Sequence, residues 1–136
     1  MSVFVDTNVF VAVRNADDVN HERAVKLMAD ALKGAYGRVF TSEDYILDEA
    51  VTLALVRTRR PELAIDVGKF ILASPRITLL IVSADMVGRA WEKFQKLAAR
   101  GLSFTDCTTL VLMEQYGIDY LLSFDRHFDG LARRIC

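Results

Sequence analysis

A chain of 136 residues, 52% of them hydrophobic and 26% charged, can fold as one domain around its own core and is too apolar to be disordered. Its apolar runs fall short of the roughly 20 residues that a membrane-spanning helix needs, and its first residues lack the pattern of a secretion signal. The formal net charge of −1 does not by itself indicate a nucleic-acid-binding protein. The two cysteines, Cys107 and Cys136, lack metal-binding spacing, so we expect free thiols in a cytoplasmic protein.

Short β-like runs alternate along the chain with longer helical segments. The strands are rich in Val, Phe, Ile and Leu, and the helices show apolar residues at helical spacing, followed by glycines. In chain order we predict strand Ser2–Val5, helices Thr7–Arg14 and Asn20–Leu32, strand Val39–Thr41, helices Ser42–Arg59 and Glu62–Leu72, strand Ile77–Val82, a helix capped by Ser83 and running through Ala99, helix Thr105–Tyr116, strand Tyr120–Phe124 and a short strand Arg133–Cys136.

Strands separated by helices indicate a parallel sheet that is covered on both faces. We therefore predict an α/β fold, a three-layer α/β/α sandwich with a central parallel sheet of four to five strands, in one domain over residues 1–136. The helix Ser42–Arg59 is apolar on almost every side in its middle, so we expect it to be central and buried. Ligands of such sheets bind beyond the carboxyl ends of the strands, so residues that follow strands are candidates for a functional site.

Four acidic residues stand where an ionised carboxylate is costly to keep: Asp6, Glu49, Asp106 and Asp125. Asp6 and Asp125 directly follow the first and fourth predicted strands. Asp106 opens a helix at the same edge, and Glu49 lies about two turns into the most apolar helix. Charges near an apolar core are usually paired or bind a metal. We therefore predict a metal-dependent enzyme that uses Mg²⁺ or Mn²⁺, because the expected ligands are all oxygen atoms.

Three of these acids also have a purely structural explanation. Asp6 can cap the helix that follows it. Asp106 can form a capping box with Ser103, with Asp in place of the usual Glu. Asp125 can be a cap or a turn residue. Position alone therefore favours catalysis modestly for Asp6, slightly favours the capping box for Asp106, and does not decide for Asp125.

Glu49 is harder to explain structurally, since its helical neighbours leave little polar surface. The competing explanation is a buried ion pair with Arg57 or Arg100. The adjacent Asp48 is expected to point to the rim.

Other acids compete less well for a place in the site. Asp44 and Asp85 lie in the first turn of helices that open with a serine, where the helix dipole explains them. Asp119 begins its strand and so lies at the wrong end of the sheet. Asp129 remains a candidate for a peripheral ligand.

Four segments resemble, in order, the four motifs of the PIN-domain family, and together they span nearly the whole chain: Val3–Asn8, Ile46–Leu53, Leu102–Asp106 and Leu121–Phe128. Each motif alone is weak, whereas four in order at this length are specific. The size of the chain is similar to that of the VapC-type toxins, the single-domain ribonucleases of bacterial and archaeal toxin–antitoxin pairs.

The resemblance implies a PIN-like fold in which Asp6, Glu49, Asp106 and Asp125 are the catalytic, metal-binding quartet. It also implies supporting roles for Thr7 or Asn8 and for Thr105, and metal-dependent hydrolysis of RNA that leaves a 5′-phosphate. Many relatives carry a further acid two residues after the fourth, where this chain has His127. We expect His127 on the surface, and the number of metals stays open.

Cations around the acidic residues are the expected contacts to RNA. The residues considered are Arg57, Arg59, Arg60 and Arg126, with Arg14 and Arg133 as further candidates. The first three form a dense cluster at the end of the Glu49 helix. That cluster is better explained as a solvated helix C-terminus, where cations suit the helix dipole.

Apolar residues in excess of one small core, among them the consecutive Phe70, Ile71 and Leu72, favour a homodimer. A small antitoxin partner is implied by the resemblance alone. Two other readings stay open: a non-catalytic or regulatory module that binds metal or RNA in an acidic pocket, and a housekeeping RNA-processing nuclease.

Overall fold

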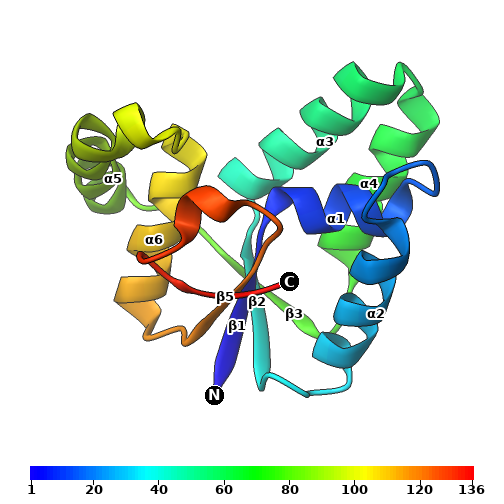
Figure 1. Cartoon of the computed structure of the whole chain (residues 1–136), viewed down its shortest axis with the longest axis horizontal. Coiled ribbons are helices and arrows are strands. Elements are labelled where there is room, and N and C mark those ends of the chain that lie inside the picture. Colours follow the sequence, from blue (N-terminus) through cyan, green and yellow to red (C-terminus); the bar gives the residue numbers. More distant parts are fainter.

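Five parallel strands form one sheet in the order β3-β2-β1-β4-β5 in the computed structural model, which describes all of residues 1–136 (Figure 1). The strands are β1 (Ser2–Val5), β2 (Arg38–Ser42), β3 (Ile77–Leu80), β4 (Tyr120–Leu122) and β5 (Arg133–Ile135). The helices are α1 (Thr7–Arg14), α2 (His21–Leu32), α3 (Tyr45–Thr58), α4 (Pro61–Ala73), α5 (Ala84–Leu97) and α6 (Phe104–Tyr116), with short 3₁₀ turns η1 (Ala98–Arg100) and η2 (Arg126–Phe128). The predicted α/β sandwich is confirmed, and its sheet includes the fifth strand.

Two groups of helices cover the sheet. Helices α1 to α4 pack on one another, and α5 packs on α6. In Figure 1 the α5–α6 pair lies to the left of the strands, while α2 and α4 lie to the right. The chain adds β2 and β3 on one side of β1 and then returns to add β4 and β5 on the other. The order thus reverses between β1 and β4, and ligands of open α/β sheets bind at the carboxyl ends of strands beside such a switch point.

The central strand β1 is enclosed on every side. Val3, Phe4 and Val5 are fully buried, because both faces of a central parallel strand are covered by helices. Phe4 pairs in register with Phe40 of β2 and Leu121 of β4. The strand therefore delivers the residue that follows it into surroundings with little water.

Predicted and observed boundaries differ most between β2 and α3. Ser42 was expected to open the helix, but it pairs with Leu80 in the sheet, and its Oγ accepts a hydrogen bond from Ile46 N at 2.9 Å. Asp44 is the N-cap of α3, and its other carboxylate oxygen accepts a hydrogen bond from Val82 N at 2.8 Å. Strand β3 ends at Leu80, two residues before the predicted end, since the chain there bonds to Asp44 instead of to a strand.

The prediction that α3 is a central, buried helix is wrong. Only Ile46, Ala50 and Ala54 of this helix are buried, whereas Leu55 and Val56 are exposed. The helix packs on α1 and α4, and its exposed residues include the polar Asp48 and Thr52 as well as Leu55 and Val56. None of the helices combines the length and the hydropathy needed to cross a membrane.

Candidate metal centre

Three of the four predicted acids come together at the carboxyl edge of the sheet. Asp6 follows β1, Glu49 lies on α3 and Asp106 lies in the first turn of α6, and one carboxylate oxygen from each lies within 4.8 Å of the others. Segments some 40 to 100 residues apart in the sequence meet here because β1 is central and the amino-terminal parts of α3 and α6 approach its end. Neither Arg57 nor Arg100 pairs with Glu49, whose side chain is half-buried.

The Asp6 carboxylate is held by hydrogen bonds on both oxygens. Its Oδ1 accepts from Thr7 N at 2.9 Å, which caps α1. Its Oδ2 accepts from Ser123 Oγ at 2.7 Å and from Asn8 Nδ2 at 3.3 Å. Asn8 also accepts a hydrogen bond from Phe124 N, so it ties α1 to the segment after β4. Of the polar residues predicted to support the acids, Asn8 is thus the one whose side chain contacts an acid, Asp6.

Ser123 was missed by the sequence prediction. It is fully buried directly after β4, donates to Asp6 and accepts a hydrogen bond from Asp125 N at 3.1 Å. The available signal was a small polar residue between Leu122 and Phe124, inside an apolar run. The hydroxyls of Thr7 and Thr105 make no hydrogen bond to the acids, and Thr7 Oγ1 is buried without a hydrogen-bond partner.

Burial and mutual repulsion raise the pKa values of two of the clustered carboxyls. Burial raises the pKa of Asp6 to about 7, with a further contribution from the charge of Asp106, although hydrogen bonds from Ser123 and Thr7 oppose the shift. Burial likewise raises the pKa of Asp106 to about 6, and the charges of Glu49 and Asp125 add to it. The protein alone does not neutralise these charges. An oxygen-only cluster of this kind fits a hard divalent cation.

Asp106 serves two purposes in the structure. The predicted capping box is present: Ser103 Oγ accepts from Asp106 N at 3.0 Å, and Asp106 Oδ2 accepts from Ser103 N at 2.8 Å. The same carboxylate is part of the acidic cluster. The capping explanation is therefore correct and does not compete with a role in the site.

Asp125 stands beside the cluster rather than within it. Its charge contributes to the raised pKa of Asp106, but no oxygen of Asp125 is among the three that gather within 4.8 Å. Asp125 Oδ1 accepts from His127 N at 2.9 Å and lies 2.8 Å from His127 Nδ1. Its second oxygen makes no protein hydrogen bond and is open to a ligand.

His127 lies on the surface, as predicted, yet it links two loops. Its side chain is about half exposed and packs on Gly101, where an added Cβ would lie 2.7 Å from His127 Nε2. The neighbouring Arg100 donates a hydrogen bond to the Asp129 carbonyl at 3.1 Å. The turn before α6 is thereby fastened to the turn that carries Asp125.

The acids set aside in the sequence prediction have structural partners or face solvent. Asp44 caps α3, Asp48 is exposed, and Asp85 lies in the first turn of α5. Asp119 accepts from Ser2 N at the opposite edge of the sheet. Asp129, the candidate peripheral ligand, pairs instead with Arg134 at 2.8 Å.

Among the predicted RNA-binding cations, Arg57 shares a cavity with two residues of the site. It lines a cavity of about 410 Å³ whose other walls include Asn8 and Asp125. Arg60 pairs with Glu62 at 2.9 Å, and Arg59 ends α3 in the left-handed conformation. Arg126 lies in η2, next to Asp125.

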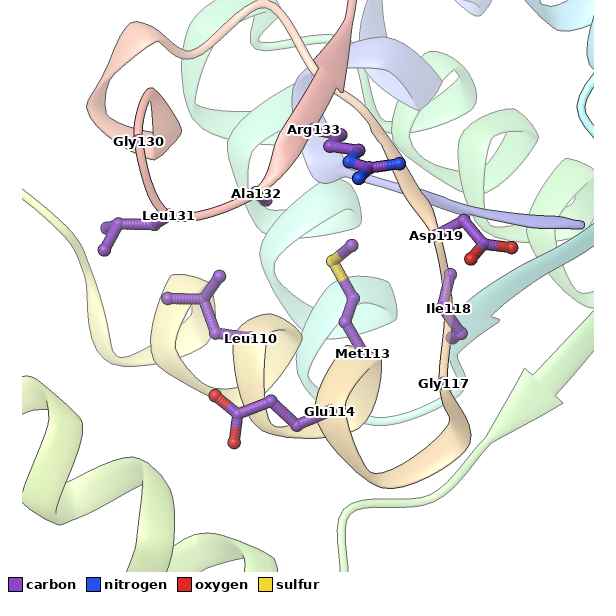
Figure 2. Close-up of a pocket in the computed structure, with 10 residues that line it drawn as sticks. All are labelled: Leu110, Met113, Glu114, Gly117, Ile118, Asp119, Gly130, Leu131, Ala132 and Arg133. Atoms are coloured by element: carbon purple, nitrogen blue, oxygen red, sulfur yellow. The ribbon is translucent and has the colours of Figure 1, made fainter.

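The remaining two candidates lie away from the cluster. Arg14 forms an ion pair with Asp66 at 2.7 Å. Arg133 lines a cavity of about 650 Å³ between α6 and β5 (Figure 2). Figure 2 shows Asp119 and Gly117 on the same wall, which places this cavity at the amino edge of the sheet, opposite the acidic cluster.

A parallel sheet with three carboxylates gathered at its switch point defines an α/β protein with a candidate site for a divalent cation. The chain belongs to the PIN domain family, whose family model matches residues 3–134. The resemblance predicted from the four motifs is thus confirmed.

Two sequence relatives cover nearly the whole chain. It is 30% identical over 128 residues to the 23S rRNA-specific endonuclease VapC20 of Mycobacterium tuberculosis, which covers 94% of this chain and 92% of that protein. It is 27% identical over 132 residues to a VapC ribonuclease of Archaeoglobus fulgidus, which covers 94% of this chain and 80% of that protein.

Two solved structures are similar to nearly the whole chain. The crystal structure of Mycobacterium tuberculosis VapC20, described as a sarcin-ricin loop cleaving toxin, matches with a TM-score of 0.81 and 31% identity over 94% of this chain and 93% of that chain. VapBC2 from Rickettsia felis, bound to a promoter DNA fragment, matches with a TM-score of 0.65 and 16% identity over 99% of this chain and 98% of that chain. At this identity the match concerns the fold alone.

Proposed function

We propose that the chain is a divalent-metal-dependent endoribonuclease of the VapC type, the toxin of a toxin–antitoxin pair. Membership of the PIN domain family and the VapC relatives support the ribonuclease activity predicted from the sequence. The observation that carries the proposal is the gathering of Asp6, Glu49 and Asp106 at the switch point of the sheet. This gathering would be electrostatically unfavourable without a cation.

In this proposal Asp6, Glu49 and Asp106 bind Mg²⁺ or Mn²⁺, and the free oxygen of Asp125 completes the site. Ser123 and Asn8 fix the orientation of the Asp6 carboxylate. A bound divalent cation would supply charge stabilisation at the scissile phosphate and would lower the pKa of an attacking water. The protein's part is to place the carboxylates and to exclude bulk water around Asp6, which is 2% exposed.

The decisive experiment replaces single acids by their amides. We expect Asp6→Asn and Asp106→Asn to lower the rate of Mg²⁺-dependent RNA cleavage by more than the roughly 100-fold that loss of a residue supporting a metal ligand costs. An RNA hairpin that carries the sarcin–ricin loop is the first substrate to test, because VapC20 is named for cleaving that loop.

Asp48→Asn is the matched control, since Asp48 is an exposed acid beside Glu49 on α3. It should cleave at the wild-type rate. Thermal unfolding in EDTA should show that Asp6→Asn is no less stable than the wild type, because the amide keeps the cap and removes repulsion. Full cleavage by either site variant would refute the proposal.

We further propose that the protein is a homodimer that pairs through α3 and α4. Leu55 and Val56 of α3 are exposed, as are Ile65 and Leu72 of α4, and α3 packs on α4. Leu72 is thus the outward-facing member of the apolar triplet noted in the sequence. Exposed apolar residues gathered on neighbouring helices indicate a protein interface.

Light scattering tests the dimer directly. We expect twice the chain mass at micromolar concentration for the wild type and the chain mass for Ile65→Glu. Val25→Glu on α2 is the control, because Val25 is similarly exposed but lies on another helix. A wild-type protein of single chain mass would contradict the proposal.

A further inference from the structure

A row of aromatic side chains begins beside the acidic cluster. Tyr45 is the first residue of α3, one turn before Glu49, and Phe104 is the first residue of α6, two residues before Asp106. The ring centroids of Tyr45 and Phe104 are 5.6 Å apart with their planes tilted by 52°. The two helices that bring acids to the cluster therefore also start with rings in contact.

The row continues onto α5 and ends at the surface. Phe94 lies 6.3 Å from Phe104, edge to face, and Trp91 stacks on Phe94 at 5.9 Å with an angle of 21° between the planes. Phe94 and Phe104 are partly buried against the core, whereas Trp91 is 53% exposed. One face of the indole is supported by Phe94, and about half of the side chain remains open to solvent.

The surroundings of Trp91 fit a nucleobase better than a protein partner. Trp91 is the one large hydrophobic residue of α5 that is exposed. Its neighbours in the chain are Ala90 and the charged Glu92. A stable protein interface needs about 800 Å² on each partner, with a contiguous core of apolar residues. A single supported ring is sufficient for one base, since every base offers a π-face to an aromatic side chain.

We infer that Trp91 is a stacking platform for an unpaired base of an RNA that occupies the acidic site. This inference rests on the proposed ribonuclease function and adds a binding position outside the acidic cluster. Phe94 supports the platform, and the contacts through Phe104 and Tyr45 fix its position relative to the cluster. The ligand class is single-stranded or looped RNA, whose bases are free to leave their own stacks.

The test measures RNA binding without cleavage. The parent is Asp6→Asn, and the probe is a fluorescently labelled RNA hairpin with an unpaired loop, in Mg²⁺ buffer. We expect Trp91→Leu in this background to weaken binding about ten-fold, as for the loss of one base–aromatic stack, and Trp91→Phe to keep most of the affinity. Trp91 is the chain's only tryptophan, so its fluorescence should be quenched as the RNA binds.

Tyr116→Leu is the matched control. Tyr116 is 48% exposed and ends α6 at the opposite edge of the sheet, so its loss should leave RNA affinity unchanged. Equal affinities of the Trp91→Leu and Tyr116→Leu variants would overturn the inference, as would absence of RNA binding by the parent. A change of mass in light scattering on Trp91→Leu would also overturn it, because Trp91 would then belong to a protein interface.

The cleavage assay separates this inference from the proposed function. In the otherwise wild-type protein, Trp91→Leu should raise KM for the hairpin and leave kcat nearly unchanged, since the platform binds a base away from the reacting phosphate. RNA binding that depends on Trp91 in a protein that does not cleave would refute the nuclease proposal and support the platform. Cleavage with an unchanged KM in Trp91→Leu would support the nuclease and refute the platform.

Discussion

Ser123 is the residue through which the end of β4 acts on the end of β1. Its hydroxyl donates to Asp6 and accepts from Asp125 N, so one buried group holds both the carboxylate of Asp6 and the backbone of Asp125. Hydrogen bonds to a ligating carboxylate fix its orientation and its basicity. Ser123 is therefore a positioning residue of the candidate site.

Replacing Ser123 by Ala should lower the affinity for Mn²⁺ about 10- to 100-fold, the usual effect of losing a group that supports a ligand. The reason is that Asp6 Oδ2 would keep only its longer hydrogen bond from Asn8. Isothermal titration calorimetry measures the affinity. Ser2→Ala is the control, because Ser2 bonds to Asp119 at the other edge of the sheet and its loss should not affect the metal. Equal affinities in both variants would exclude the positioning role.

Single residues also show where prediction from the sequence stops. The capping roles considered for Asp6, Asp106 and Asp125 are all present in the structure. Each carboxylate has two oxygens, so a residue can cap a helix and still take part in a site. A sequence pattern for a cap therefore could not exclude a role in the site, and only the three-dimensional gathering separates Asp6 and Asp106 from an ordinary cap such as Asp44.

At the scale of elements, the turn between η1 and α6 is fastened to η2 through Gly101 and His127. Gly101 has a φ of 94°, and an added Cβ would meet His127 Nε2 at 2.7 Å. The His127 ring is half exposed and can swing away, which would remove its contact with Asp125 Oδ1. Gly34 has nearly the same φ, 95°, with no atom within 4 Å of an added Cβ.

These two glycines make a matched pair for substitution. Gly101→Ala and Gly34→Ala should each destabilise the protein by about 1–2 kcal/mol, because both place an L-residue in the left-handed region. Only Gly101→Ala should also weaken Mn²⁺ binding, by about ten-fold, through the loss of support for Asp125. Urea unfolding and calorimetry measure the two effects. Equal metal affinity in both variants would show that the His127 contact does not support the site.

Element types were predictable from the sequence, whereas element ends and burial were not. The strands are short apolar runs and the helices have helical apolar spacing, so local pattern determines both. The start of α3 depends on Ser42 pairing with Leu80 and on the bond between Asp44 and Val82 N, contacts that no local pattern records. The exposure of Leu55 and Val56 on α3 was likewise not predictable, because an apolar pattern does not distinguish a helix that is buried all round from one that is exposed on one side.

At the scale of the whole molecule, the order of the strands determines what the site can be. β1 and β4 lie side by side at the switch point of the strand order. Asp6 and Ser123, which follow these two strands, therefore meet at the edge where a crevice forms. The helices α3 and α6 then bring acids from opposite sides of that crevice. A buried apolar strand beneath the cluster makes the charges costly, so the stability of the whole fold becomes linked to protons and to metal ions.

The linkage predicts how the stability of the metal-free protein depends on pH. The pKa of Asp6 rises to about 7 and that of Asp106 to about 6 in the folded state, from an ordinary value of 3.8. At these two carboxyls the folded state therefore binds protons more tightly than the unfolded state. Their contribution to the free energy of unfolding is fully present below pH ~4 and is lost as pH rises towards 7. Arginines lower the pKa values of Asp66 and Asp129, so the stability that these two carboxyls contribute is lost only as pH falls below ~4 and does not change between pH 5 and pH 8.

Thermal unfolding in EDTA between pH 5 and pH 8 should accordingly show a Tm that falls with rising pH. Asp6→Asn should remove most of that slope, because Asp6 has the larger pKa shift. Millimolar Mn²⁺ should raise the Tm most at pH 8, where the ion no longer competes with protons for the carboxylates and binds only the folded state. A Tm that rises with pH in EDTA would contradict the raised pKa values of Asp6 and Asp106, since burial and repulsion favour the protonated form of these two carboxyls in the folded state.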